Sequence, residues 1–330
     1  MSGTILAIES SCDDSCAAVL GGDGVVLSNI ISSQGIHDRY GGVVPEIAAR
    51  QHLQLLTPAI EAALSQAQVT LADLDCVAVT QGPGLIGALL VGVAQAKAIA
   101  AARGLPLVAV DHLQGHVAAN FIGLEPFEPP FICLIASGGH TLVARVEDHS
   151  SYLLLGETLD DAAGEAFDKG ARMLGLPFPG GPALQALAAD GDDESFQFPV
   201  ARNVEGCNFS FAGVKTSLLY ATRDLGEEEA EARRADLAAS YQKAIVDALV
   251  ERLTKALDAS GLDRVAIGGG VAANGLLRSR ITALGAVCHI PELSLCTDNA
   301  AMIASAARYL DPCSPAQALT LDAYPSGTRR

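Results

Sequence analysis

Two histidines four residues apart are the first candidates for chemistry in this sequence. They lie in Asp111-His112-Leu113-Gln114-Gly115-His116, directly after an apolar run. On a helix, residues at this spacing share a face, so both imidazoles can coordinate one metal ion. The alternative is a pair of partly buried structural histidines. Zinc-protease chemistry is excluded, because it needs a Glu directly after the first histidine, where Leu113 stands.

A metal site here needs a third ligand. The acidic candidates in predicted turns are Asp298, Asp160 and Asp161. The residues alone leave the choice among them open.

Glycine-rich turns are the second group of candidates. Gly138-Gly139, Gly180-Gly181 and residues 268–270 each adjoin a predicted strand or helix end. Glycine lets backbone N–H groups approach an anion closely, so turns of this kind in a duplicated fold favour a nucleotide pocket. Asn274 follows the last turn and either hydrogen-bonds a base or ribose or caps a helix.

A further glycine motif, residues 82–87, indicates a different ligand, a dinucleotide cofactor. It follows a predicted strand and opens a helix, and Asp111 ends the next strand, where a ribose-binding acid of a dinucleotide site is expected. Tight packing of helix on strand explains these glycines equally well.

The third group is the acidic run at residues 160–169. Asp161, Glu165 and Asp168 can share a helical face, and like charges this close are unfavourable unless something positive binds them. Either Asp168 pairs with Lys169 or Arg172, or it binds a ligand hydroxyl or amine.

Strands and helices alternate along the chain, which is typical of an α/β protein. In the first part we predict strands at 4–9, 16–20, 25–30, 76–80 and 107–110 and helices at 45–64 and 85–102. A second strand, polar hairpin and strand at 131–146 repeats the opening of the chain. The repeat predicts two similar halves that face each other across a cleft, where α/β proteins usually bind ligands.

Composition limits the function further. The 330 residues are half apolar and carry a net charge of −17, so a large core is expected and general affinity for nucleic acid is excluded. We expect no signal peptide and no membrane span, because acids follow the first apolar run at once and the longest apolar stretch is well short of about 18 residues. Eight cysteines without a Cys-x-x-Cys pair indicate reduced thiols.

A series of motifs resembles one protein family, the bacterial-type tRNA threonylcarbamoyladenosine transferases (TsaD), over essentially the whole chain. The motifs are Ile8-Glu9-Ser10-Ser11-Cys12-Asp13-Asp14, Tyr40-Gly41-Gly42-Val43-Val44-Pro45-Glu46, Gly82-Pro83-Gly84-Leu85, His112 with His116, Ser137-Gly138-Gly139-His140-Thr141, residues 160–169, Phe209-Ser210-Phe211, Gly269-Gly270-Val271-Ala272-Ala273-Asn274 and Cys296-Thr297-Asp298-Asn299-Ala300-Ala301.

This resemblance implies a fold and an activity. The fold is the actin-like, sugar-kinase-like (ASKHA) fold with a duplicated RNase H-like core, its lobes at residues 1–125 plus 296–330 and at residues 126–295. The activity is transfer of threonylcarbamoyl from threonylcarbamoyl-AMP to N6 of adenosine 37 in tRNAs that read codons beginning with A. The product is t6A, and AMP is released.

The resemblance also assigns residues, a cofactor and partners. It makes His112, His116 and Asp298 the ligands of one divalent ion, Fe²⁺ or alternatively Zn²⁺. Substrate-binding residues carried over from the motifs are Ile135, Ala136, Ser137, Gly138, Gly139, Asp168, Gly181 and Asn274. No general base is implied. The expected partners are the tRNA anticodon loop, a non-catalytic TsaB-like paralogue and a TsaE-like P-loop ATPase, in the cytoplasm.

Two departures from the family pattern stand beside the first histidine. Asp111 and Gln114 replace a common Asn and a frequent Glu, so a role for that Glu is in doubt, while Asp111 can orient an imidazole. Two other functions remain as alternatives: a small-molecule kinase of the same fold, which needs no histidine pair, and a non-catalytic scaffold paralogue, which should lack the ligand set.

Overall fold

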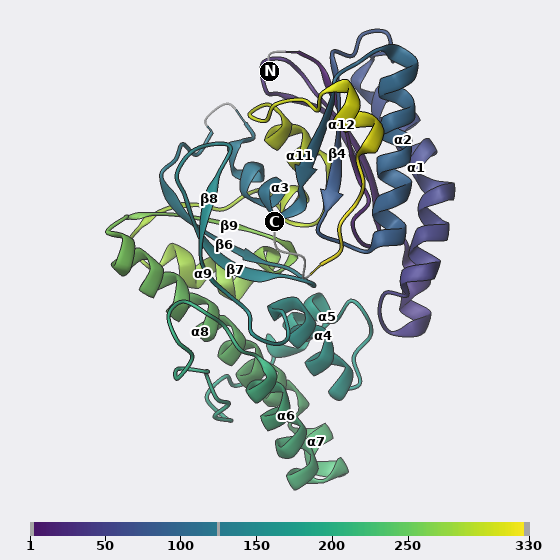
Figure 1. Cartoon of the computed structure of the whole chain (residues 1–330). Coiled ribbons are helices and arrows are strands. Elements are labelled where there is room, and N and C mark those ends of the chain that lie inside the picture. The colour runs from purple at the N-terminus through teal and green to yellow at the C-terminus, as the bar shows by residue number, and fades with distance from the viewer. Residues whose placement is uncertain (1–2, 124–125, 327–330) are drawn as a thin grey trace. The chain divides into compact units, whose positions relative to one another are not determined.

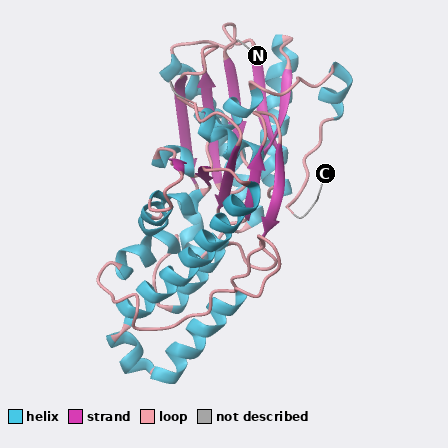
Figure 2. Cartoon of the chain, turned by 90° about the vertical axis from the view of Figure 1, so that its left-hand side faces the viewer, coloured by secondary structure: helices cyan, strands magenta, loops and turns pink. Residues whose placement is uncertain are grey.

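The computed structural model describes residues 3–123 and 126–326, which form two compact units. The first unit comprises Met1–Pro129, Asp148–Ser151 and Asp298–Arg330, and the second Pro130–Glu147 and Tyr152–Thr297. Each contains one five-stranded sheet flanked by helices (Figures 1 and 2).

The sheet of the first unit has the order β3-β2-β1-β4-β5. Its strands are β1 (Ile5–Glu9), β2 (Asp14–Leu20), β3 (Val26–Ser33), β4 (Cys76–Gly82) and β5 (Leu107–Asp111). The first three form an antiparallel meander, and β4 and β5 continue it parallel to β1. Every residue of β1 is buried, as expected for a central strand that is covered on both faces.

Helices cover both faces of this sheet. They are α1 (Pro45–Ala67), α2 (Ile86–Arg103), α3 (His112–Ala118), α11 (Ala300–Ala307) and α12 (Pro315–Thr320), with short 3₁₀ turns at Gly35–Tyr40 and Ala119–Phe121. α1 and α2 lie together on one face, and α3 and α11 lie on the other (Figure 1). Proline at the first position of α1 and a left-handed Gly104 after α2 account for where these helices begin and end.

The second unit repeats this topology. Its sheet, in the order β8-β7-β6-β9-β10, consists of β6 (Phe131–Ala136), β7 (Thr141–Val146), β8 (Tyr152–Glu157), β9 (Arg264–Gly268) and β10 (Val287–His289). Again an antiparallel meander is extended by two parallel strands. The predicted duplication is therefore confirmed at the level of strand order and direction.

A large apolar core lies between this second sheet and its helices. These are α4 (Ala163–Met173), α5 (Gly180–Ala188), α6 (Ala212–Leu225), α7 (Glu227–Ala232), α8 (Arg234–Ser260), α9 (Gly275–Thr282), α10 (Leu293–Cys296) and the 3₁₀ turn Gly270–Ala273. The longest of them, α8, contacts both β6 and β7 and contributes Tyr241, which is fully buried.

The predicted boundaries differ from the observed ones where polar residues pair. β2 begins at Asp14, two residues before the predicted start, and β3 runs to Ser33. Asp14 and Ser15 pair with Ser33 and Ser32 in the ladder. Backbone pairing extends these strands beyond their apolar residues. Hydropathy does not detect this extension, because the added residues are polar.

One helix of the described residues, α2, is long and apolar enough to cross a membrane by length and composition alone. A third of that stretch is buried, and the helix packs against α1 and β4. The eight cysteines are all free thiols, as predicted.

Candidate metal centre

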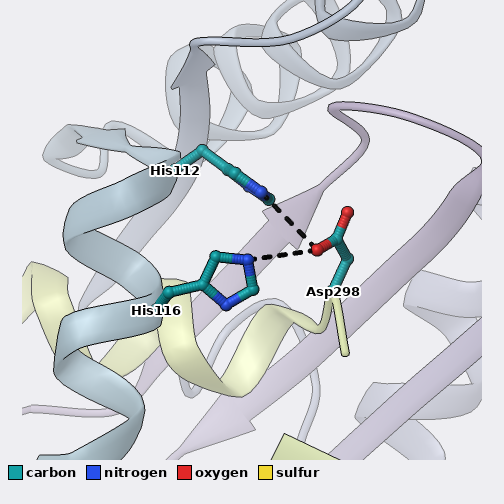
Figure 3. A group of neighbouring side chains, drawn as sticks. All are labelled: His112, His116 and Asp298. Atoms are coloured by element: carbon teal, nitrogen blue, oxygen red, sulfur yellow. Dashed lines mark ion pairs between the residues drawn. The ribbon is translucent and has the colours of Figure 1, made fainter. Parts of the chain in front are cut away.

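The two histidines lie on one face of α3, as predicted from their spacing. Both side chains are buried, and the ring centroids are 4.7 Å apart in an edge-to-face arrangement. Figure 3 shows both rings directed from α3 toward Asp298.

Helix α3 is held by a cap at its first residues and by packing of its side against α11. Asp111 ends β5, and its Oδ1 accepts hydrogen bonds from the backbone N–H groups of Leu113 (2.8 Å) and Gln114 (3.0 Å), so that it caps the helix. Gly115 faces α11, where a Cβ would stand 2.7 Å from Ile303 Cδ1. Glycine at this position therefore allows the two helices to approach closely.

These contacts answer two questions left by the sequence. Asp111 acts as a helix cap, which explains this residue without a dinucleotide ribose. Gln114 is buried and donates from Nε2 to the carbonyl of His149 (3.1 Å).

Asp298 is the acid that lies beside the pair. Its Oδ1 is 3.5 Å from His112 Nε2 and 3.2 Å from His116 Nε2, and one ligand atom of each residue lies within 4.8 Å of the other two. The next residue, Asn299, caps α11 by accepting from Met302 N (3.0 Å), so α11 holds the aspartate at its N-terminal end. The three residues form the one such group found among the described residues.

The other two acidic candidates are engaged in the second unit. Asp160 accepts from Ser210 Oγ (2.5 Å) and Phe211 N (2.7 Å). Asp161 pairs with Lys169 (2.8 Å) and Lys215 (2.7 Å).

The donor set fits a divalent ion. Neither ring nitrogen of the fully buried His116 makes a hydrogen bond, although Nε2 faces the Asp298 carboxylate. A buried polar atom without a partner is destabilising, and a metal–nitrogen bond would satisfy it. Two imidazoles and one carboxylate suit iron or zinc and leave coordination positions open.

Glu9, to which sequence reasoning gave no role, lies behind His112. The buried carboxylate of Glu9 is 2.9 Å from His112 Nδ1 and accepts from Thr80 Oγ1 (2.6 Å) and from Ser11 N. A ligating histidine commonly donates its other ring N–H to a carboxylate, which fixes the ring and leaves the opposite nitrogen for the metal. An acid in the last position of an otherwise apolar strand was the available signal.

Charge is concentrated around this group. Burial lowers the pKa of His112, but the carboxylates of Asp298 and Glu9 outweigh it and raise the pKa to about 9. Burial likewise raises the pKa of Glu9, and His112 reverses the effect to a net lowering. Burial, with Asp298 and Asp13 nearby, raises the pKa of Asp14 to about 7. Several partly desolvated carboxylates at one place are typical of a cation site.

The second unit contains a cavity of about 550 Å³. Four of the predicted substrate residues line it, namely Gly138, Asp168, Gly181 and Asn274. The other four do not line the cavity but lie within three residues of Gly138 in the sequence. Ile135 and Ala136 are buried in β6. Ser137 and Gly139 belong to the turn that is closed by the hydrogen bond from Ser137 N to His140 O (2.8 Å).

Asp168 and Asn274 connect the walls of this cavity. Asp168 Oδ1 accepts from Gly180 N (2.8 Å), at the start of α5. Asn274 caps α9 through Leu277 N (3.0 Å), and its Nδ2 donates to Gln242 Oε1 (2.9 Å). The cap alternative for Asn274 is thus confirmed, and the residue also faces the cavity.

The predicted acidic helical face is wrong in one respect. α4 begins at Ala163, so Asp161 precedes the helix. Lys169 pairs with Asp161 and Glu165 (2.8 and 2.7 Å), and Lys215 of α6 completes the network. These lysines pair with Asp161 and Glu165, while Asp168 lines the cavity.

Comparison with known proteins gives one result at the level of sequence. Residues 25–305 match the model of the family described as "TsaD: tRNA N6-adenosine threonylcarbamoyltransferase". A protein of that name from Clostridium botulinum (strain 657 / Type Ba4) is 48% identical over 92% of both chains. Another, from Symbiobacterium thermophilum, is 50% identical over 98% of this chain and 96% of its own.

Solved structures resemble the chain in fold. HypF of T. kodakarensis has a TM-score of 0.64 at 16% identity, covering 93% of this chain and 48% of its own. Component A of the Acidaminococcus fermentans (R)-2-hydroxyglutaryl-CoA dehydratase has a TM-score of 0.58 at 16% identity, covering 93% and 97%. The architecture is actin-like and sugar-kinase-like (ASKHA), as predicted.

Proposed function

The chain belongs to the tRNA N6-adenosine threonylcarbamoyltransferase family, and from this we propose that it transfers threonylcarbamoyl from threonylcarbamoyl-AMP to N6 of adenosine 37. The tRNAs are those that read codons beginning with A. A bond forms between N6 and the carbamoyl carbon, the bond from that carbon to the phosphate oxygen breaks, and AMP leaves with the electron pair. N6 loses a proton, for which no residue is assigned.

The metal-binding part of the proposal rests on one observation, the buried group His112, His116 and Asp298 in a chain of this family. These residues would hold one Fe²⁺, or alternatively Zn²⁺. The ion would supply Lewis acidity toward oxygens of the substrate. Glu9 keeps the His112 ring oriented by accepting from Nδ1, and Asp111 holds the helix that carries both rings.

The cavity of the second unit is proposed to bind the adenylate. Its volume of about 550 Å³ falls in the range of about 300–1,000 Å³ typical of small-molecule sites. A Cβ on Gly138, Gly181 or Gly270 would meet no atom within 4 Å, so the backbone there is open to a ligand. N–H groups of such turns and of the α5 N-terminus suit a phosphate.

Asp168 and Thr297 would complete that site. A carboxylate has room for several donors, so Asp168 can accept a ribose hydroxyl as well as Gly180 N. Thr297 lines the cavity and is followed in the chain directly by Asp298. Orientation of an already activated substrate and stabilisation of charge are what these residues contribute, without a nucleophile from the protein.

The net charge of −17 argues for partner proteins. Because phosphate contacts dominate RNA affinity, an acidic chain holds tRNA weakly by itself. We therefore propose that a TsaB-like paralogue and a TsaE-like P-loop ATPase contribute to holding the anticodon loop, in the cytoplasm. Tight tRNA binding by the isolated chain at physiological salt would contradict this.

The test is tRNA modification by the purified full chain with these partners. We expect t6A by mass spectrometry of the tRNA nucleosides and AMP in equal amount. The double substitution His112→Ala with His116→Ala should remove both t6A and bound metal, measured by elemental analysis, and leave the circular dichroism spectrum unchanged. His289→Ala, in β10 of the second unit, is the matched control.

Each outcome has a separate meaning. Unchanged modification in the double variant refutes the metal site. Phosphorylation of a metabolite from ATP, with no t6A formed, refutes the proposed reaction.

A further inference from the structure

The chain from the last turn of α12 onward is anchored along the first unit. In Figure 1 this C-terminal segment runs from α12 past the end of β4. Lys97 Nζ of α2 donates to the carbonyls of Leu319 (2.8 Å) and Leu321 (3.1 Å). Gln81 of β4 donates from Nε2 to Asp322 O (2.7 Å), and its carbonyl accepts from Tyr324 N (3.1 Å).

The glycine motif at residues 82–87 makes room for this segment. A Cβ on Gly82 would stand 2.4 Å from the carbonyl oxygen of Tyr324. The carbonyl of Gly84 accepts from Ser326 N (3.4 Å). The motif therefore serves as the surface on which the C-terminal segment docks.

Tyr324 connects the segment to the helix that carries the histidines. The residue is 8% exposed, and its hydroxyl donates to Oδ2 of Asp111. The other oxygen, Oδ1, caps α3 through Leu113 N and Gln114 N. One carboxylate thus binds the C-terminal segment with one oxygen and the start of α3 with the other.

The capped helix is short, so its first turn determines where the rings lie. α3 has seven residues, His112 is the first, and His116 follows one turn later. A hydrogen bond from a hydroxyl to a carboxylate is among the stronger kinds, and it limits the rotation of Asp111. Losing it releases the cap and, with it, the backbone from which both rings project.

We propose that Tyr324 is a positioning residue for the metal centre, acting through Asp111 on α3, so that residues 321–326 set the affinity for the metal. The proposal rests on the metal centre of the proposed function. Tyr324 would act without ligating the ion. Its effect is to hold His112 and His116 where Asp298 can share one ion with them.

The experiment measures Co²⁺ binding by the full-length metal-free chain, through the visible absorption that reports coordination geometry. Tyr324→Phe removes one oxygen and keeps the ring, and it should weaken binding about threefold to tenfold, less than the loss of a group bonded directly to a ligand. Tyr220→Phe, which changes a half-exposed tyrosine of α6 in the second unit, is the matched control and should bind as the wild type does.

Substitution of Asp111 tests whether Tyr324 acts on α3 through this carboxylate. Asp111→Asn keeps the capping oxygen, and its Nδ2 can donate to the Tyr324 hydroxyl, which then accepts instead of donating, so the variant should retain affinity within about twofold. Asp111→Ala should weaken binding at least as much as Tyr324→Phe, and adding Tyr324→Phe to it should have little further effect. Independent, additive effects of the two would overturn the proposal, as would wild-type affinity and spectrum in Tyr324→Phe.

Hydrogen exchange separates this inference from the metal centre itself. In the metal-free chain, the amides of α3 should exchange about threefold to tenfold faster in Tyr324→Phe than in the wild type. If the wild type binds no Co²⁺, the metal centre of the proposed function fails, and exchange alone decides whether Tyr324 positions α3. Unchanged exchange then overturns the inference.

Discussion

Replacing Glu9 by glutamine tests how the metal centre is held. The two side chains have nearly the same shape, so packing in β1 is kept, while the charge and one acceptor oxygen are lost. Glu9 is fully buried and receives hydrogen bonds from His112 Nδ1 (2.9 Å), Thr80 Oγ1 (2.6 Å) and Ser11 N. A glutamine has one carbonyl oxygen for these donors, and its amide group must face at least one of them.

The size of the effect follows from those contacts. Loss of the partner behind a ligating histidine lowers metal affinity about 10- to 100-fold, or ~1.4–2.7 kcal/mol. In the metal-free chain, a buried donor left without an acceptor destabilises the fold by about 1–3 kcal/mol. We therefore expect Glu9→Gln to weaken Zn²⁺ binding more than tenfold and to lower the free energy of unfolding as well.

Two measurements separate these effects. Zn²⁺ affinity of the full chain is measured by competition with a chelator, and stability by urea unfolding of the metal-free protein. Glu228→Gln, an exposed change on α7, is the control for loss of a carboxylate. If Glu9→Gln binds Zn²⁺ within twofold of the wild type, Glu9 does not orient His112 and the assignment is refuted.

Four further predictions each follow from a single residue. Because the pKa of His112 is about 9 in the metal-free chain and only the neutral ring binds metal, metal binding near neutral pH should release about one proton, measured by calorimetry in buffers of different ionisation enthalpy. No release at neutral pH would contradict that pKa. The same raised pKa stabilises the metal-free fold below about pH 6.5, and this contribution is lost as the pH rises through about 9, which urea unfolding of the metal-free chain across this pH range measures. Gly181→Val should fold normally, because a Cβ there meets no atom within 4 Å, yet weaken AMP binding more than about tenfold by filling the cavity; equilibrium dialysis showing wild-type affinity would place AMP elsewhere. Tyr241→Phe removes the buried bond to Ala166 O (2.8 Å) and should lower the free energy of unfolding in urea by about 1–3 kcal/mol, whereas a neutral result would mean that the carbonyl finds another donor.

The duplicated α/β fold could be predicted from the sequence because its signals are local. Alternating apolar strands and alanine-rich helices, and the two similar hairpins at the start of each half, indicated the topology that both sheets show. The shared helical face of His112 and His116 was equally local, since it depends only on a spacing of four. Motif resemblance then singled out Asp298, although the residues alone left Asp160 and Asp161 open.

Only the tertiary structure decided how these residues act. Glu9 and His112 are 103 positions apart, and Tyr324 and Asp111 are 213 apart, so no periodicity connects them. The sequence alone determined which elements form and which side chains share a helix or a turn. Which carboxylate faces which ring depends on how strands pair and helices pack. A buried charge without a partner is strongly destabilising, so the folded structure pairs each buried carboxylate with a particular donor.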